Sequence, residues 1–295
     1  MNFLLHREIP ILKYKVINIL FFLAGRKFQT FAIFVCSIFH LHAQTGKTML
    51  HQNYRLIAHR GGIVDSTNAE NSLPAMQAAA KKGYTMVEID LRLTKDSVLI
   101  IQHDAGFKRY YGNDSLVTAM TWKEISRLRS DKNNSKVLSF EEALQFCSGK
   151  LEVMIDNKIA GNDTVLFSKV IALLKKYNLD KNALMIGTEV STPFFTGKIK
   201  LSCTRKQLEE NMRKPGYSPA HYYLFGADLT KEDVIWAKRN NITAVGVVNE
   251  WRYKRTNAGK DDIQKDIQRL KDTGLQYFQI DSQYQPFFTE PAQVN

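Results

Sequence analysis

Residues 85–104 read TMVEIDLRLTKDSVLIIQHD, and they decide the class of fold that we predict. Residues 85–93 and 98–103 are rich in Val, Ile and Leu, which favours two β-strands. The polar tetrapeptide Thr94-Lys95-Asp96-Ser97 separates them and is typical of a turn. The pattern therefore predicts a β-hairpin.

The predicted hairpin would bring carboxylates and a histidine together. With the turn centred between its second and third residues, His103 lies opposite Glu88, and Ile101 lies opposite Asp90. Opposed residues in such a ladder stand ~5 Å apart. Glu88 and Asp90 point to the same face because they are two residues apart on one strand. We therefore expect backbone geometry alone to bring these groups together.

Four short polar motifs lie between residues 59 and 104. They are His59-Arg60-Gly61, Glu70-Asn71, Glu88-Ile89-Asp90 and His103-Asp104. Most of them lie at or beside an apolar run, and the ends of strands are where α/β proteins place their binding sites. Two histidines, an arginine and several carboxylates could hold a divalent metal and a phosphate with an acid and a base beside them.

These motifs resemble the glycerophosphodiester phosphodiesterase family in their order and spacing. The likeness includes residues 57–62, Glu70-Asn71-Ser72, Glu88-Ile89-Asp90-Leu91 and His103-Asp104, and it continues more weakly through residues 137–144 to Ile280-Asp281. It covers residues 54–288 in total. The resemblance implies a TIM (β/α)₈ barrel of the phospholipase-C-like phosphodiesterase type. It also implies an enzyme that hydrolyses glycerophosphodiesters to sn-glycerol 3-phosphate and an alcohol.

The resemblance makes His59 and His103 the acid–base pair. We assign His59 as the base and His103 as the acid, and the reverse assignment stays open. Arg60 can bind phosphate oxygens through its planar fork. Asp104 can hold His103 in one tautomer.

The resemblance also implies a metal site. Glu88, Asp90 and Asp156 offer oxygen atoms only, which suit Mg²⁺ or Ca²⁺ better than zinc. The family has a glutamate where this chain has Asp156, so the position or affinity of the metal can differ. Glu70 completes the site as a ligand or as a residue behind the ligands. The alternative for Glu88 and Asp90 is an amphipathic strand with a solvated face, but in a closed barrel that face points inward, where unpaired carboxylates are unfavourable.

Three further residues belong to the predicted site. Asn71, beside Glu70, is expected to support the metal ligands, and Lys158 is expected to neutralise phosphate or to pair with Glu70. The family often has a tryptophan near the seventh strand. This chain has Gly246-Val247-Val248-Asn249 there, so Trp251 is expected to replace that wall of the substrate pocket.

Strands and helices alternate along the rest of the chain, which predicts a parallel sheet. The predicted strands are 54–59, 85–92, 98–103, 151–157, 183–188, 198–203, 221–225, 243–248 and 276–281. The predicted helices are 72–82, 121–129, 139–147, 164–177, 205–213, 230–240 and 261–273. With 98–103 counted as a hairpin strand after the second strand, eight parallel strands remain, as in a closed (β/α)₈ barrel.

Composition narrows the class of partner. The chain has 295 residues, 44% of them hydrophobic, which is ordinary for one α/β barrel. Its formal net charge of +12 suits anionic partners such as small phosphodiesters or the surface of a membrane, although a basic solvated surface is an equal alternative. Since no basic run is interleaved with aromatic residues, we do not expect nucleic acid as a partner.

The first 43 residues read as an export signal. Arg26-Lys27 precede the apolar run 28–41, and Ala43 offers a small residue for cleavage. The run is shorter than the ~20 residues that span a bilayer. We expect a signal peptide in residues 1–43, a phosphodiesterase domain in 44–295, and a periplasmic or secreted product. A second apolar run, 16–25, leaves a membrane anchor as the alternative.

Two cysteines remain after the leader, Cys147 and Cys203. They could pair in an oxidising compartment, but two buried free thiols are the favoured state.

Two other functions stay open. One is a phospholipase-like barrel that cuts intact phospholipids, whose sign would be an apolar rim at Phe194-Phe195 and Trp251. The other is a non-catalytic barrel that binds phosphate, against which the intact His59 and His103 argue.

Overall fold

The computed structural model describes residues 54–289. They belong to the larger of two units into which the chain divides, Met49–Asn295. The predicted leader, residues 1–43, lies outside the described residues. Within residues 54–289, no helix is both long and apolar enough to cross a membrane.

Eight parallel strands form a closed ring, so the predicted (β/α)₈ barrel is confirmed. Each strand pairs with the next, and the first strand pairs with both the second and the last. The strands are β1 (Arg55–Ala58), β2 (Met86–Leu93), β6 (Glu152–Asn157), β7 (Leu184–Ile186), β8 (Lys200–Cys203), β9 (Tyr222–Gly226), β10 (Thr243–Val248) and β11 (Tyr277–Ile280). The predicted strands correspond to these in order.

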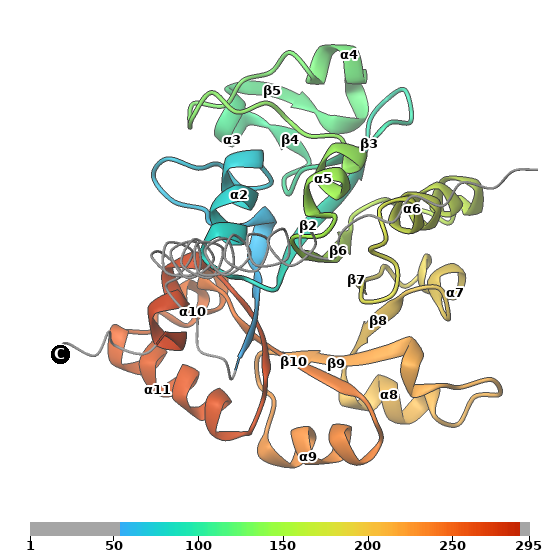
Figure 1. Cartoon of the computed structure of the whole chain (residues 1–295), viewed down its shortest axis with the longest axis vertical. Coiled ribbons are helices and arrows are strands. Elements are labelled where there is room, and N and C mark those ends of the chain that lie inside the picture. The colour runs from blue at the N-terminus through green and yellow to red at the C-terminus, as the bar shows by residue number, and fades with distance from the viewer. Residues whose placement is uncertain (1–53, 290–295) are drawn as a thin grey trace, which may run out of the picture. The chain divides into compact units, whose positions relative to one another are not determined.

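Helices lie outside the ring of strands (Figure 1). The longer ones are α2 (Leu73–Lys81), α5 (Phe140–Cys147), α6 (Thr164–Lys176), α8 (Arg205–Asn211), α9 (Lys231–Arg239) and α11 (Lys260–Asp272). Most begin at a Ser, Thr or Asp whose side chain accepts a hydrogen bond from the first turn, as Ser72 and Ser139 do. Helices α3 (Lys108–Tyr111), α4 (Trp122–Ile125), α7 (Thr192–Phe195) and α10 (Glu250–Thr256) lie in the connections between these elements.

The predicted helix over 121–129 is too long. Glu124 Oε2 accepts hydrogen bonds from the Thr121 N–H and hydroxyl at the start of the helix, but the helix ends at Ile125. The next turn has hydrogen bonds between residues three apart, such as that from the Leu128 N–H to the Ile125 carbonyl.

Alternation along the strands separates two cores. Inside the barrel, six strands each contribute one buried hydrophobic residue to a small core, in which Met86 packs with Ile57, Met154, Leu184, Tyr223 and Val245. The alternate residues Val87, Ile89 and Leu91 belong to the larger core beneath the helices. Because Glu88 and Asp90 follow Met86 in steps of two, they face the interior at the carboxyl end of β2.

The hairpin after β2 forms, but its predicted register is wrong by one residue. In β3 (Leu99–Ile101), Ile101 pairs with Leu91 rather than with Asp90. The cause is an extra residue in the turn, since Thr94 and Val98 close a loop in which Ser97 has a φ of 60°. His103 therefore lies beyond β3 and does not oppose Glu88.

An insertion with a core of its own follows β3. It contains β4 (Gly106–Phe107), α3 and β5 (Asn113–Leu116), none of which was predicted from the sequence. Phe107, Val117, Ile125 and Val137 pack around Ile100 of the hairpin. The hairpin therefore anchors the insertion beside the carboxyl ends of the barrel strands.

Both remaining cysteines are buried free thiols, as favoured from the sequence. Burial raises the pKa of Cys147 to about 12 and that of Cys203 to about 11. Neither thiol is therefore ionised to a useful degree near neutral pH.

Candidate active site

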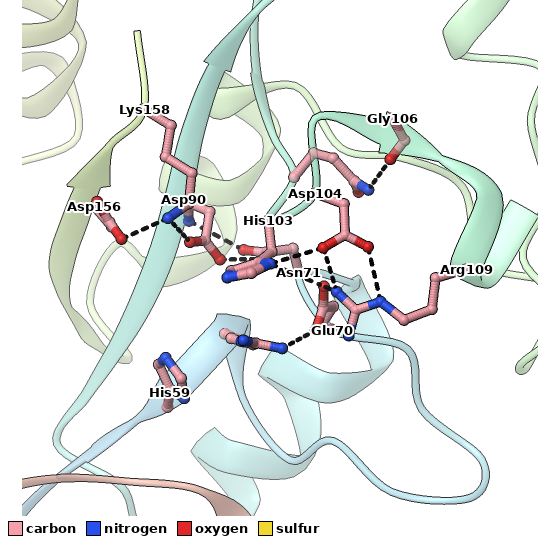
Figure 2. A network of polar contacts seen from close by, with 12 residues as sticks. His59, Glu70, Asn71, Asp90, His103, Asp104, Gly106, Arg109, Asp156 and Lys158 are labelled. Atoms are coloured by element: carbon pink, nitrogen blue, oxygen red, sulfur yellow. Dashed lines mark hydrogen bonds and ion pairs between the residues drawn. The ribbon is translucent and has the colours of Figure 1, made fainter. Parts of the chain in front are cut away.

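The polar residues gather where barrel strands end at their carboxyl side (Figure 2). His59 follows β1 directly and lies in the 3₁₀ turn His59–Gly61, while Asp281 follows β11. Glu88 and Asp90 lie on β2, and Asp156 lies on the neighbouring β6. This edge is where α/β barrels carry their active sites.

Three predicted metal ligands meet in one acidic group. Asp90 pairs with Asp156 in the parallel ladder between β2 and β6. Carboxylate oxygens of Glu88, Asp90 and Asp156 lie within 4.8 Å of one another. Lys158 reaches into the group, with its Nζ 2.6 Å from Asp156 Oδ2 and 3.1 Å from Asp90 Oδ1 (Figure 2). The predicted pairing of Lys158 with Glu70 is wrong, because the ammonium pairs with these two aspartates.

The acidic group has three carboxyl groups, and Lys158 is the cation that pairs with two of them. Glu88 and Asp90 are each only 1% exposed, so neither lies on a solvated face. Burial, followed by the nearby Asp90 and Asp156, raises the pKa of Glu88 well above its ordinary value. The buried Asp90 Oδ1 has the Lys158 ammonium as its charged neighbour, at 3.1 Å. Two buried carboxylates and the partly exposed Asp156 offer oxygen donors only, which fit a hard divalent cation.

The loops that carry Arg60 and Asn71 support this group by close contact. Both residues have a left-handed backbone, with φ of 53° and 52°. The Asn71 N–H donates to the Arg60 carbonyl, and a Cβ on Gly61 would lie 2.6 Å from Asn71 Cα, so only glycine fits there. The Asn71 side chain donates to Asp90 Oδ2 at 2.8 Å, and the Arg60 N–H donates to Glu88 Oε2 at 2.7 Å.

Glu70 does not join the acidic group. Arg60 donates to its Oε2 at 3.1 Å, and Arg109 donates to its Oε1 at 2.5 Å. Its other neighbours are His103 and Asp104. Burial raises the pKa of Glu70, and the two arginines and His103 only partly oppose the rise. Glu70, His103 and Asp104 form a second group whose ligand atoms lie within 4.8 Å of one another, so both predicted roles of Glu70, as a ligand or behind the ligands, stay predictions.

His103 is held by the carboxylate predicted for it. Its Nδ1 lies 2.9 Å from Asp104 Oδ1. Arg109 binds both oxygens of Asp104, at 2.7 and 2.8 Å. Burial would raise the pKa of Asp104, but the hydrogen bonds from Arg109 and His103 hold it below its ordinary value. Asp104 therefore remains ionised and accepts from Nδ1, which leaves Nε2 of His103 for chemistry.

His59 also has a carboxylate partner. Its Nδ1 lies 2.6 Å from Asp281 Oδ1, while Asp281 Oδ2 accepts from the Glu250 N–H at 2.5 Å. Burial would raise the pKa of Asp281, but the hydrogen bond from His59 leads several effects that hold it below its ordinary value. Asp281 therefore selects the tautomer in which Nε2 of His59 carries the lone pair, 3.9 Å from Glu88 Oε2.

A cavity of about 350 Å³ opens beside His59, Arg60 and Glu70, and its lining includes neither His103 nor the acidic group. His59, Arg60, Glu70, Arg109 and Asp281 line it together with Tyr110, Glu250, Trp251, Lys254 and Gln283. Trp251 is 48% exposed and forms part of the wall, as expected from the sequence. A volume of this size accommodates a small phosphodiester.

The predicted aromatic rim is only partly correct. Trp251 is exposed, but Phe195 is fully buried. Phe194 packs edge-on against Phe195, with ring centroids 5.1 Å apart, and both contact Phe167 of α6. Phe194 and Phe195 therefore close the gap between helices rather than form a rim.

Sequence reasoning assigned no role to two residues of this site. Asp281 was visible as the end of the last predicted strand and as the last residue of the family resemblance, but no role was derived for it. Arg109 lies in the unpredicted helix α3, six residues beyond His103, and nothing in its local pattern indicated that it faces Glu70. Its position depends on how the insertion folds.

Comparisons with known proteins agree with this geometry. Residues 59–185 match the sequence model of the glycerophosphoryl diester phosphodiesterase family. Lysophospholipase D GDPD1 of Homo sapiens is 31% identical over 153 residues, which are 44% of this chain and 46% of that protein. Glycerophosphodiester phosphodiesterase 1 of Bos taurus is 34% identical over 111 residues, 35% of this chain and 33% of that protein. The matches thus span less than half the length of these two relatives.

Solved structures share the fold. A glycerophosphoryl diester phosphodiesterase from Parabacteroides distasonis superposes with a TM-score of 0.65 at 19% identity, covering 79% of this chain and 85% of that one. An Oleispira antarctica phosphodiesterase, solved with sn-glycerol-3-phosphate, gives a TM-score of 0.60 at 17% identity, covering 79% of this chain and 94% of that one. Residues 59–185 are thus similar in sequence to the glycerophosphoryl diester phosphodiesterase family, and the barrel as a whole shares its fold with solved members of that family.

Proposed function

We propose that this chain is a metal-dependent phosphodiesterase that hydrolyses glycerophosphodiesters to sn-glycerol 3-phosphate and an alcohol. The observation that carries the proposal is the arrangement of His59 and His103, each held through Nδ1 by its own carboxylate beside a buried acidic group. Two histidines with free Nε2 atoms can supply one base and one acid to a phosphodiester. A non-catalytic barrel would not need both pairs.

The proposed reaction moves one proton at each histidine. His59 Nε2 takes a proton from the attacking water or hydroxyl as its oxygen forms a bond to phosphorus. The bond from phosphorus to the alcohol oxygen breaks, and His103 Nε2 gives its proton to that oxygen. The reverse assignment of the two histidines would give the same products.

Arg60 is the proposed phosphate ligand. Its Nη1 is bound to Glu70, but its Nε is buried and has no hydrogen-bond partner within residues 54–289. An unpaired buried guanidinium N–H is unfavourable, and a phosphoryl oxygen would satisfy it. Glu70 thus fixes one side of the guanidinium, and Arg60 lines the cavity.

Glu88, Asp90 and Asp156 would hold a divalent cation, Mg²⁺ or Ca²⁺, whose chemistry when bound is to offset the negative charge on the phosphoryl oxygens. Lys158 lies in the same group and adds a positive charge beside the two aspartates. It can move toward a bound phosphate once a cation neutralises these carboxylates. The cation and the Lys158 ammonium are both positive, so both would offset the negative charge of a bound phosphate.

Replacement of each histidine by alanine tests the proposed acid–base roles. We expect His59→Ala and His103→Ala each to lower kcat on glycerophosphocholine by about 10²–10⁴-fold, the usual range of acid–base assistance. A nitrophenolate leaving group needs little protonation. On the nitrophenyl ester of glycerol 3-phosphate, His103→Ala should therefore approach the wild-type kcat, while His59→Ala should not. His221→Ala, outside the site, is the matched control. The opposite rescue would exchange the roles, and near-normal activity of both variants would refute the mechanism.

We also propose that the protein is exported, because residues 1–43 have the pattern of a signal peptide. N-terminal sequencing of protein from its native host should begin near Gln44. A membrane-bound product that retains residues before Phe28 would favour the anchor instead. The exposed Trp251 at the cavity mouth is the side chain that we propose for contact with a membrane surface.

A further inference from the structure

Strand β2, which carries Glu88 and Asp90, also carries Arg92 near its carboxyl end. Because these three residues are two apart, their side chains leave the same face of the strand. Glu88 and Asp90 are buried, whereas Arg92 is partly buried and reaches the loop that follows β3. One strand therefore presents the proposed metal ligands and, beyond them, a guanidinium beside the segment that contains His103.

The guanidinium of Arg92 binds two consecutive peptide carbonyls. Its Nη2 donates to the His103 carbonyl at 2.6 Å, and its Nε donates to the carbonyls of Gln102 and His103, each at 3.1 Å. The ladder between β2 and β3 ends at Ile101, so neither carbonyl belongs to it. Hydrogen bonds from a charged donor are stronger than those from a neutral one. Arg92 thus holds the backbone of His103 where the sheet no longer does.

The other contacts of His103 set the orientation of its ring. Asp104, which lies 2.9 Å from Nδ1, belongs to the same loop, and Arg109, which binds Asp104, belongs to the insertion. Neither group is part of a barrel strand. The position of the loop relative to β2 depends instead on the guanidinium bonds and on the Gln102 N–H, which donates to the Asp90 carbonyl at 2.8 Å.

Arg92 is also close to several negative charges. Burial lowers the pKa of Arg92, and the carboxylates of Asp90, Asp104 and Asp156 oppose that change. Since an arginine stays protonated in proteins, its positive charge could by itself serve to offset these carboxylates. The fork geometry and the charge are therefore two separate contributions, and a lysine, which keeps only the charge, distinguishes them.

We propose that Arg92 is a positioning residue for His103. By binding the carbonyls of residues 102 and 103, it fixes the His103 imidazole at a set distance from Glu88 and Asp90 on the strand. The kinetic consequences rest on the proposed function, in which His103 exchanges a proton with a phosphodiester. Proton transfer needs the two atoms within hydrogen-bond reach, and a displacement of about 1 Å can lower the rate by about 10²-fold.

Two substitutions of Arg92 test this with glycerophosphocholine as substrate. Arg92→Met keeps the length of the side chain but has no donor, so we expect kcat to fall by about 10- to 100-fold with KM changed less than about twofold. Arg92→Lys keeps the charge but not the planar fork, so it should recover only part of the loss. Full recovery of kcat in Arg92→Lys would show that charge suffices and would overturn the proposal, as would a normal kcat in Arg92→Met.

If Arg92 acts through His103, its removal has no effect once the imidazole is gone. Arg92→Met/His103→Ala should therefore have the kcat of His103→Ala within about twofold. Arg269→Met is the matched control, because Arg269 donates to the carbonyls of Ala227 and Leu229 in the loop after β9. It should lower the melting temperature and leave kcat near that of wild type. A further loss of about tenfold in the double variant, or equal losses in Arg92→Met and Arg269→Met, would overturn the proposal.

Amide hydrogen exchange followed by NMR separates this inference from the proposed function, because it needs no turnover. The Gln102 N–H donates to the Asp90 carbonyl, while the Thr94 N–H donates to the Val98 carbonyl at 3.0 Å in the turn of the same hairpin. In Arg92→Met, exchange at Gln102 should be faster by about tenfold or more, and exchange at Thr94 should be unchanged.

Faster exchange at Gln102 alone supports the positioning role even if no diester is hydrolysed. Equal exchange at Gln102 in wild type and Arg92→Met overturns it even in an active phosphodiesterase. Faster exchange at both amides also overturns it, because the whole hairpin would then be loosened.

Discussion

Replacement of Asp281 by asparagine changes the charge beside His59 with little change in shape. The carboxylate accepts two hydrogen bonds, one from His59 Nδ1 at 2.6 Å and one from the Glu250 N–H at 2.5 Å. An asparagine has one oxygen and one NH₂ group, so it can accept only one of the two in this geometry. Either His59 loses its acceptor and its tautomer reverses, or the Glu250 N–H is left opposite another donor.

The size of the effect follows from these contacts. A buried donor without a partner lowers the free energy of unfolding by about 1–3 kcal/mol. With the wrong tautomer, His59 Nε2 carries a proton and cannot act as a base, so we expect kcat to fall by about 10²–10⁴-fold. The assay is release of glycerol 3-phosphate from glycerophosphocholine, with urea unfolding to measure stability.

A double-mutant cycle tests whether Asp281 acts through His59. If it does, His59→Ala/Asp281→Asn should have the same kcat as His59→Ala alone, within about twofold. An additional hundredfold loss in the double variant would refute the reasoning, as would a single Asp281→Asn variant with normal kcat.

The same residue predicts a pH dependence of stability. The pKa of Asp281 is held below its ordinary value in the folded protein. Its contribution is therefore present above the unfolded-state pKa, ~3.9, and is lost as the pH falls through the lower folded-state pKa. The difference in unfolding free energy between wild type and Asp281→Asn should shrink below about pH 4. A difference that stays constant to pH 2 would contradict this assignment.

Three further substitutions probe the charged network. Lys158→Met leaves Asp90 and Asp156 without their counter-charge, so the melting temperature without metal should fall, and a cation at 100 times its Kd should restore about 2.7 kcal/mol. Glu88→Gln keeps an acceptor for the Arg60 N–H but removes a buried carboxyl group whose pKa is raised. Without metal the variant should therefore be more stable than wild type, and the difference should grow as the pH rises through that pKa. Thermal stabilisation by Ca²⁺ or Mg²⁺ should disappear. The lysine of Arg109→Lys cannot bind both oxygens of Asp104, so kcat/KM should fall about tenfold, and it should fall further in Arg109→Gln. The pH–rate profiles of both variants should shift, because Asp104 holds His103 less firmly. Melting curves and pH–rate profiles check these outcomes, and variants indistinguishable from wild type would contradict them.

Most of the fold was predictable because its signals are local. Strands and helices can be recognised from residues close together in the sequence. Ser72 and Ser139, for example, cap the starts of α2 and α5. The closed barrel then follows from the number of parallel strands. The hairpin register was missed because it depends on the left-handed backbone of Ser97, a residue with no strong preference for that conformation.

The candidate site was predictable where its residues lie on strands. Glu88, Asp90 and Asp156 meet because the register of β2 and β6 is set by the barrel. The environment of Glu70 was not predictable, because its partner Arg109 comes from an insertion whose packing depends on distant residues. Whether a carboxylate faces a metal or an arginine depends on such long-range placement.

The most direct test of the central claim is a ³¹P NMR time course of glycerophosphocholine with the purified full chain. We expect the diester signal to be replaced by that of sn-glycerol 3-phosphate when Mg²⁺ or Ca²⁺ is present. Excess chelator should stop the conversion, and His59→Ala should slow it by about 10²-fold or more. An unchanged diester signal with either metal, or equal conversion in chelator after dialysis, would contradict the account.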